Sequence, residues 1–372
     1  MSTSSMMSAP YVPNNRLYSS KAWGAIALVV AIFAALPALN LFFPAGHPLH
    51  VSAFVIALIG KFICYAMAAL ALDLVWGYTG ILSLGHGLFF ALGGYAHGMY
   101  LMRAAKPSPD IVPDFMTFLS WKTYPWFWSF TENFWYAALL VVVAPGLLAF
   151  LFGYFAFRSR IKGVYFSIIT QALTFAAMLL FFRNETGFGG NNGFTDFKKI
   201  LGYDITSSNT RAVLYWVSLT TLFGALILSR AITQSKLGRV LTAIRDSEGR
   251  LRFLGYEPLG FKLFIWTFSA MLCAVAGALY VPQVGIINPG EMSTENSIEM
   301  VIWVATGGRG TLVGPIIGAG AINGLKTWFT SVFPEFWLYA LGLIFVLVTL
   351  FLPQGLVGLA RQISQRLKGA KT

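Results

Sequence analysis

Charged residues are scarce in this chain. Of its 372 residues, 11% are Asp, Glu, Lys or Arg, whereas 57% are hydrophobic, and the mean hydropathy is +0.69. Soluble domains carry about 25% charged residues, and their surfaces need polar groups that this composition does not supply. The shortage therefore excludes an ordinary soluble domain and predicts a protein whose solvent is largely lipid.

Cysteine is nearly absent, and so are the common motifs of catalysis. The two cysteines, Cys64 and Cys273, each lie inside an apolar run, so we expect packing residues rather than a disulfide framework or a metal site. No G-x-x-x-x-G-K-[ST] loop, H-E-x-x-H or G-x-S-x-G occurs. The sequence therefore predicts neither an ATPase nor another enzyme, and no cofactor in this chain.

Apolar runs long enough to span a membrane recur along the chain. A spanning helix needs about 20 mostly apolar residues, and the first such run is longer than the apolar core of a cleaved signal peptide. The expected fold is an all-α polytopic membrane bundle of about ten helices. The ten candidate segments are 23–43, 52–76, 85–102, 134–157, 163–182, 212–230, 262–281, 297–306 with its continuation, 311–330 and 336–352. Because 297–306 is short alone, nine segments are the alternative.

Basic and acidic residues divide between alternate loops. With ten segments and a cytoplasmic N-terminus, most Lys and Arg lie on the inside, whereas most acids, including Glu291, Glu295 and Glu299, lie in outside loops. Both termini are then cytoplasmic. The net charge of +12 becomes a signal of topology, and the spread of the basic residues argues against a nucleic-acid partner.

This topology divides the chain into a cytoplasmic tail, a transmembrane domain and a second, basic cytoplasmic tail. Their ranges are 1–22, 23–358 and 359–372, with outside loops at 103–133 and 183–211 and an inside loop at 231–261. In the first outside loop, an aromatic cluster suits an interfacial belt; a docking surface for an external partner is the alternative. The cluster comprises Trp121, Tyr124, Trp126 and Trp128.

Two glycine-rich stretches interrupt the apolar runs. "GYTGILSLGHG" (77–87) and "GGRGTLVGPIIGAGAING" (307–324) both begin with G-x-x-G-x-L. Irregular backbone at membrane depth survives only when it is buried in protein or lines a wet cavity, and transporters use broken helices at substrate sites. We expect the breaks to be permitted by Gly77, Gly80, Gly85, Gly307 and Gly310.

Polar side chains accompany both breaks. A polar residue within a membrane segment indicates a function by default, so the candidates for lining a translocation path are Thr79, Ser83, His86 and Thr306. A hydrogen-bonded packing residue is the alternative for His86.

Few charges lie inside the apolar runs, which leaves little to drive a stand-alone channel or secondary transporter. The candidates are Lys61, Asp73, Glu299 and Lys326. We expect the two lysines to reach toward the outer face, and Asp73 to bind backbone near the break or a helix end.

The inside loop "SKLGRVLTAIRDSEGRLRFLGYEPLGFK" (235–262) is amphipathic. Leu237, Leu241, Ile244, Leu251 and Leu254 recur at intervals that suit short helices. A membrane-surface helix would need mainly basic residues. The mixture of both signs around "AIRDSE" instead suits docking into a groove on another protein.

Three stretches carry a resemblance to a known family. "GYTGILSLGHG", "GRVLTAIRDSEGRLRFLGY" and "AGALY" (276–280) resemble permeases of the branched-chain amino-acid and urea class of ABC importers, over about residues 52–358. Within that class, "NETGFGGNNGFTDF" (184–197), the segment 280–315, "WFTSVFPEFW" (328–337) and the insertion at 103–133 are similar to the longer urea permease. After "AIRDSE" the amino-acid branch usually has alanines, whereas this chain has Gly249, Arg250 and Leu251.

The resemblance implies a subunit of a larger assembly in the bacterial cytoplasmic (inner) membrane. Its partners would be a homologous second permease, two ATP-binding subunits that hold ATP and Mg, and a periplasmic substrate-binding protein. A coupling helix near 238–250 would contact the ATPase, with Gly238, Arg239, Ile244, Arg245, Asp246, Ser247, Glu248 and Gly255 involved. The expected substrate is urea; a branched-chain amino-acid permease and a stand-alone channel or secondary transporter are the alternatives.

Overall fold

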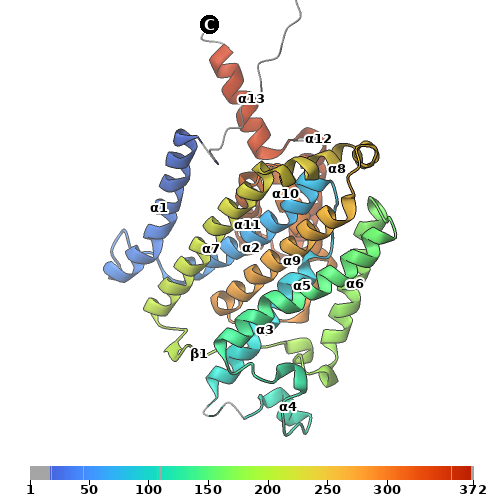
Figure 1. Ribbon diagram of the computed structural model, residues 1–372. Coiled ribbons are helices and arrows are strands. Elements are labelled where there is room, and N and C mark those ends of the chain that lie inside the picture. Colours follow the sequence, from blue (N-terminus) through green and yellow to red (C-terminus); the bar gives the residue numbers. More distant parts are fainter. Residues whose placement is uncertain are drawn as a thin grey trace, which may run out of the picture.

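The protein is described by a computed structural model that covers residues 17, 19–44, 46–106, 108, 111–352 and 354–369. It is a bundle of helices with one short two-stranded ribbon (Figure 1). The expected all-α polytopic bundle is confirmed. Most of the predicted N-terminal tail and the last three residues of the predicted C-terminal tail lie outside the described residues.

Ten helices coincide with the predicted membrane segments. They are α1 (Ser20–Phe42), α2 (Ala53–Thr79), α3 (His86–Ala105), α5 (Phe134–Arg158), α6 (Val164–Phe182), α7 (Ser208–Gln234), α9 (Pro258–Val284), α10 (Thr294–Gly307), α11 (Val313–Val332) and α12 (Trp337–Phe351). By length and composition alone, α1, α2, α5, α6, α7 and α9 could each cross a membrane. The other four are shorter or less apolar, and packing against the longer helices places them in the bundle.

The remaining elements lie at the two ends of the bundle or connect its helices. They are α4 (Asp114–Phe118), α8 (Lys236–Phe253), α13 (Gly355–Gly369), the 3₁₀ turns η1 (Trp126–Trp128), η2 (Asn184–Thr186), η3 (Gly190–Asn192), η4 (Pro289–Met292) and η5 (Pro334–Phe336), and the strands β1 (Lys199–Ile200) and β2 (Tyr203–Asp204). The strands pair antiparallel, with Ile200 opposite Tyr203.

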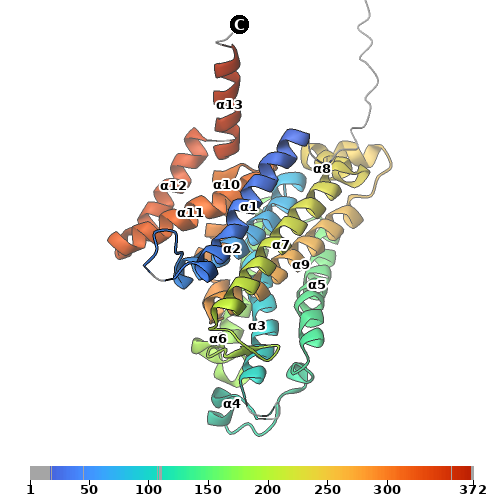
Figure 2. The same ribbon diagram turned by 90° about the vertical axis from the view of Figure 1, so that its left-hand side faces the viewer.

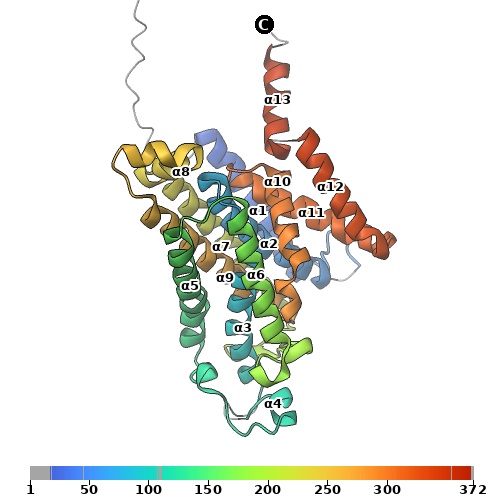
Figure 3. The same ribbon diagram turned by 90° about the vertical axis from the view of Figure 1, so that its right-hand side faces the viewer.

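The two ends of the bundle differ in character. Helices α8 and α13 and the start of α1 lie at one end, and α4 and the ribbon lie at the other (Figures 1, 2 and 3). We call these the α8 end and the loop end. The carbonyl of Leu17 accepts hydrogen bonds from Arg230 Nε (3.1 Å) and Gln234 Nε2 (3.0 Å), which ties the chain before α1 to the α8 end of α7. The N-terminal side of α1 and the C-terminal helix therefore share one end of the bundle.

Helices α3 and α9 approach most closely through two glycines. A Cβ atom at Gly93 would overlap the carbonyl of Ala274, and one at Gly277 would overlap the carbonyl of Phe90. Small residues at such contacts let membrane helices gain dispersion energy where no hydrophobic force acts between them. Cys64 and Cys273 are buried free thiols in this core, as expected of packing residues.

The aromatic residues of the predicted outside loop 103–133 form a packed layer with the second predicted outside loop, 183–211. Trp128 is buried, and its Nε1 donates to the Gly187 carbonyl at 2.9 Å. Its ring also contacts Phe188 and Phe194 edge-on. An interfacial belt therefore does not describe Trp128, because its indole is held inside protein. Only Trp126 of the predicted cluster is strongly exposed, at 85%.

Replacing Gly277 by Val should destabilise the bundle. The new side chain would force α3 and α9 apart, and overpacking of this kind costs about 1–3 kcal/mol. The melting temperature of the detergent-solubilised protein should fall by several degrees. Gly224→Val is the control, because nothing lies within 4 Å of a Cβ at that position in α7. Equal melting temperatures for the two variants would contradict the close contact.

Candidate functional site

Both glycine-rich stretches break a helix. Helix α2 ends at Thr79, residues 80–85 are irregular, and α3 begins at His86. Helix α10 ends at Gly307, and α11 begins at Val313. Gly80 and Gly310 occupy the same position of the repeated G-x-x-G-x-L pattern, and their φ angles are 74° and 75°. The two breaks therefore turn the chain with the same left-handed residue, which glycine adopts without steric cost.

The other three glycines expected at the breaks have a different role. Gly77 and Gly307 are helical, and Gly85 has a φ of −101°, which any residue can adopt. A Cβ at Gly77 would lie 2.7 Å from the Cα of Gly310, and one at Gly85 would lie 3.1 Å from Thr170 Cβ. These three glycines allow close approach of neighbouring segments rather than an unusual backbone.

Asp73 joins the two breaks. Its carboxylate is fully buried in α2; Oδ1 accepts the Gly310 N–H at 2.6 Å and Oδ2 accepts the Leu312 N–H at 3.1 Å. These N–H groups belong to the turn between α10 and α11, where Leu312 itself has a φ of 61°. The prediction that Asp73 is a structural partner of the backbone is confirmed.

Helix α8 contacts the same junction. The Arg245 guanidinium donates from Nη1 to the carbonyl of Gly77 at 3.0 Å, in the last turn of α2. A cation at this position is favourable because the last carbonyls of a helix carry partial negative charge. The end of α2, the turn 308–312 and α8 thus form one connected unit.

The predicted amphipathic helix is present and has two parts. Helix α8 runs Lys236–Phe253 but bends at Ser247, whose φ and ψ are −165° and 95°. Leu241, Ile244 and Leu251 are buried against the bundle. Gly238 lies so close to the Thr233 carbonyl that a Cβ would overlap it.

Several residues of the predicted coupling set remain at the surface. Arg239 and Asp246 are exposed on α8, and the Asp246 carboxylate is paired with Arg245 at 3.1 Å. Gly255 has a φ of 83° and follows the last turn of the helix. These positions present both signs of charge at the α8 end of the bundle.

Glu248 differs from Arg239 and Asp246, because its carboxylate points into the protein. Its carboxylate contacts Lys162 (3.0 Å), Arg252 (2.8 Å) and Lys262 (3.2 Å), which come from the α5–α6 connection, α8 and α9. Burial raises the pKa of Glu248, but hydrogen bonds from Arg252 and Lys162 and the charge of Lys262 outweigh it and lower the pKa to about 2. A cavity of about 130 Å³ adjoins this cluster and is also lined by Thr79 and Gly80.

Three of the four candidate path residues are hydrogen-bonded inside the bundle. The Ser269 hydroxyl donates to the Ala71 carbonyl, so His86 Nε2 is the donor in its 2.8 Å contact with Ser269 Oγ. His86 Nδ1 lies 3.2 Å from Ser83 Oγ, and Thr79 Oγ1 donates to Val75. This geometry matches the alternative for His86, a hydrogen-bonded packing residue.

Thr306, the fourth candidate, is different. It is 5% exposed, and its hydroxyl has no hydrogen-bond partner in the part of the chain that the structure describes.

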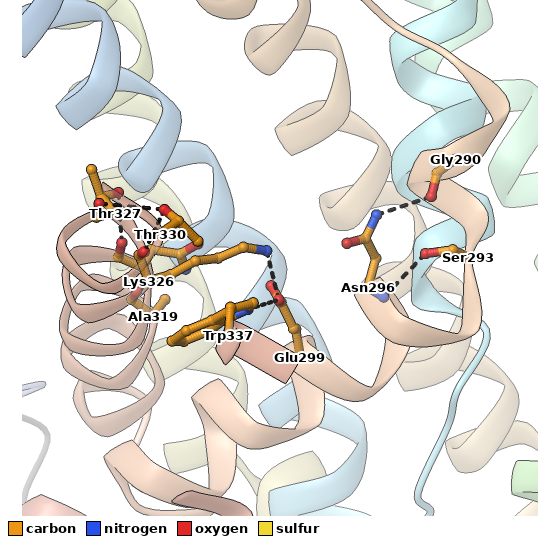
Figure 4. Close-up of polar contacts among 10 residues, drawn as sticks. Gly290, Ser293, Asn296, Glu299, Ala319, Lys326, Thr327, Thr330 and Trp337 are labelled. Carbon is orange, nitrogen blue, oxygen red and sulfur yellow. Dashed lines mark hydrogen bonds and ion pairs between the residues drawn. The ribbon is translucent and has the colours of Figure 1, made fainter. Parts of the chain in front are cut away.

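An ion pair lies inside the membrane segments. Glu299 was expected both among the outside acids and among the charges inside apolar runs; it is a buried residue of α10, in agreement with the second expectation. Its Oε1 accepts from Lys326 Nζ at 2.6 Å and from Trp337 Nε1 at 3.1 Å, as Figure 4 shows. The Lys326 side chain is 35% exposed, so its ammonium pairs with a buried carboxylate while part of the side chain stays accessible. The signal available in the sequence was that both charges interrupt apolar runs.

Comparison with known proteins bears directly on this architecture. The model of the family described as "Branched-chain amino acid transport system / permease component" matches residues 54–352. The chain belongs to this family. That range includes both breaks, α8 and the Glu299–Lys326 pair. It is accordingly a multi-pass membrane protein of the transport permease type.

Individual relatives are permeases that are named for different substrates. The chain is 25% identical to the high-affinity branched-chain amino acid transport system permease protein LivM of Salmonella typhimurium, over 80% of this chain and 68% of that protein. It is 26% identical to BraD of Pseudomonas aeruginosa, over 79% and 91%. It is 30% identical to the autoinducer 2 import system permease protein LsrC of Enterobacter, over 51% and 54%. No solved structure matches the chain.

Replacing Asp73 by Ala should strongly destabilise this permease. The change leaves two buried N–H groups without their acceptor, and hydrogen bonds to charged groups contribute about 1.5–3 kcal/mol each. A lower melting temperature in detergent is the expected result. Asp114→Ala is the control, since that side chain is 94% exposed and its ion pair with Lys106 lies at the surface; its effect should stay within about 0.5 kcal/mol. Similar losses in both variants would show that the carboxylate of Asp73 has no special role.

The Glu248 cluster predicts a dependence of stability on pH. Because the folded protein holds the pKa of Glu248 near 2, below its ordinary value of 4.5, the stabilisation is complete above about pH 4.5 and is lost as the pH falls toward 2. The parent should therefore melt at a higher temperature than Glu248→Gln at pH 7. This difference should stay constant down to about pH 5 and shrink below it. A difference that grows on acidification would contradict the ion cluster.

Proposed function

We propose that this chain is the membrane-spanning permease subunit of an ATP-driven importer and that it forms half of a translocation path. The position of α8 is the observation that carries the proposal. It is a charged helix at one end of a membrane bundle, it is bonded to the break after α2, and it leaves Arg239 and Asp246 exposed. Such a surface suits a partner that moves α8, because α8 contacts the bundle at several helices.

The partners follow from what this chain does not contain. Its sequence has no phosphate-binding loop, so ATP hydrolysis belongs to two separate ATP-binding subunits. A homologous second permease would complete the path, and a periplasmic substrate-binding protein would deliver the solute at the loop end. In this arrangement the α8 end faces the cytoplasm of a bacterial inner membrane, and both termini are cytoplasmic.

Branched-chain amino acids are the first candidate substrates. The matching family and the relatives LivM and BraD are named for the transport of branched-chain amino acids. Urea, expected from the sequence, is the second candidate. Its support is the resemblance of 184–197, 280–315 and 328–337 to urea permeases and the aromatic insertion at 103–133. The relative LsrC shows that related permeases are named for other solutes as well.

Uptake by cells distinguishes the two substrates. Deleting this chain should abolish high-affinity uptake of labelled leucine, and urea uptake at low concentration should be unchanged. Leucine uptake should return when the chain is supplied on a plasmid. Loss of urea uptake with normal leucine uptake would establish the second candidate instead and leave the permease assignment intact.

Reversing the charge of Arg239 tests the role of α8. Arg239→Glu should reduce both ATP-driven uptake and co-purification of the ATP-binding subunit, about tenfold, because charge complementarity governs association at exposed surfaces. Arg183→Glu is the matched control, since this arginine is 71% exposed at the end of α6 opposite to α8. Normal assembly and transport by Arg239→Glu would contradict docking at this surface.

A further inference from the structure

Helix α10 carries a stripe of polar residues along one face. Asn296, Glu299, Trp303 and Thr306 are spaced by three, four and three residues, which places them within about 80° of one another around a helix of 3.6 residues per turn. Glu299, Trp303 and Thr306 are each more than nine-tenths buried. A helix of this bundle would be expected to turn apolar residues inward, so this stripe needs an explanation.

The stripe faces α2 and α11. The ring of Trp303 lies 4.9 Å from that of Tyr65 in α2, and Glu299 pairs with Lys326 of α11. Around Lys326, α11 carries further polar residues at helical spacing, namely Asn323, which is buried, Thr327 and Thr330. Figure 4 shows Thr327 and Thr330 on the same helix as Lys326. A polar layer therefore runs between three helices that pack against one another.

Two polar atoms in this layer are left without partners. Trp303 Nε1 and Thr306 Oγ1 have no hydrogen-bond partner among the described residues. Leaving a buried polar atom unpaired is destabilising because its lost hydration is not replaced, so each such atom in a native structure needs an explanation, and a bound water or solute is one. Both atoms lie on the stripe, on the side of Glu299 toward the α8 end.

The charges of the layer balance. The ammonium of Lys326 pairs with Glu299, and a second lysine and a second carboxylate lie near them. Lys61 of α2 lies within electrostatic range of Glu291, Glu299 and Lys326, and Glu291 accepts a hydrogen bond from the Tyr280 hydroxyl at 2.9 Å. Buried ion pairs rarely add stability over apolar packing, and charges at membrane depth commonly mark solute paths.

We propose that Glu299, Trp303 and Thr306 of α10 together with Lys326 of α11, which we call the α10 seam, form a solute-binding station on the translocation path. The solute class is a small molecule of no net charge that carries both N–H donors and an oxygen acceptor. Lys326 and Trp303 Nε1 donate to the oxygen, and the Glu299 carboxylate accepts from the N–H groups. A net cation or anion would leave one member of the ion pair unmatched, so the seam disfavours it.

This inference rests on the proposed transport function and deepens it. An amino-acid zwitterion and urea both have the required chemistry, so the seam accounts for either candidate. The sequence predicts that Ser83, His86 and Thr306 line the path. In the present proposal Thr306 stays on the path, whereas residues of the α10 seam replace the hydrogen-bonded Ser83 and His86.

Cysteine accessibility tests whether the seam is open to water. In a background with Cys64→Ala and Cys273→Ala, Thr306→Cys in the assembled importer should react with a membrane-impermeant thiol reagent in at least one nucleotide state. Val301→Cys is the matched control, because Val301 is buried on the opposite face of the same helix. It should stay unlabelled. Equal labelling of both positions, or no labelling at 306 in any state, would overturn the proposal.

Protection of Thr306→Cys from the thiol reagent tests whether a solute binds at the seam, and it identifies which solute binds. Binding protein loaded with leucine or with urea should slow labelling at 306 at least about fivefold, and the solute that protects is the one transported. In an assembly that transports one of them, labelling that neither solute slows would overturn the station. If the assembly takes up neither solute, the proposed substrates are wrong. In that case the comparison of labelling at position 306 with labelling at position 301 alone tests whether the α10 seam is open to water.

Neutralising the ion pair tests the charges directly. The double variant Glu299→Gln/Lys326→Met avoids an unpaired buried charge, so it should insert normally, whereas Lys326→Met alone leaves the buried Glu299 carboxylate without its ion-pair partner. Uptake by the double variant should fall about tenfold, the loss expected from about 1.4 kcal/mol of solute binding. Glu335→Gln, an exposed acid just before α12, is the control and should transport normally. Parental uptake by the double variant would overturn the proposal.

Discussion

The bonds from Asp73 to the turn between α10 and α11 hold the two breaks of this bundle together. Wherever a helix stops inside a membrane protein, its N–H and C=O groups need partners that lipid cannot provide. Asp73 lies in the C-terminal part of α2, and its carboxylate accepts hydrogen bonds from the N–H groups of Gly310 and Leu312. The Asp73 carboxylate is buried away from water, so it needs the N–H groups of the turn, and the turn needs its oxygens. The turn and α2 therefore stabilise each other.

Helix α8 acts on this junction from outside the bundle. Arg245 binds the Gly77 carbonyl, and Glu248 holds the α5–α6 connection and α9 through Lys162 and Lys262. A displacement of α8 would therefore disturb contacts with α2, with the α5–α6 connection and with α9 at the same time. The bend at Ser247 separates these two groups of contacts, with Arg245 before it and Glu248 after it. These contacts, together with those of Asp73, connect the surface of α8 to both breaks, which is the connection that the proposed coupling to an ATPase requires.

The polar interior of the bundle divides into two kinds of site. Around His86, every described ring contact is either a hydrogen bond or aromatic packing, including an edge-on contact with Trp266 at 5.6 Å. Around α10, by contrast, Trp303 and Thr306 have polar atoms without partners beside a charge pair. A satisfied network stabilises a packed core, whereas an unsatisfied one has capacity left for water or solute. This contrast supports the proposal that the path runs beside α10 rather than at the first break.

The sequence alone determined the features that depend on local patterns. Long apolar runs, the glycine breaks at 77–87 and 307–324, and the amphipathic loop at 235–262 all follow from composition and spacing within one segment. Only the tertiary structure decided which distant residues meet: that Asp73 binds the second break, that Glu248 turns inward, and that Glu299 pairs with Lys326. The physical reason is that burying a charge or an indole requires a partner from another helix, and packing of the whole bundle chooses that partner.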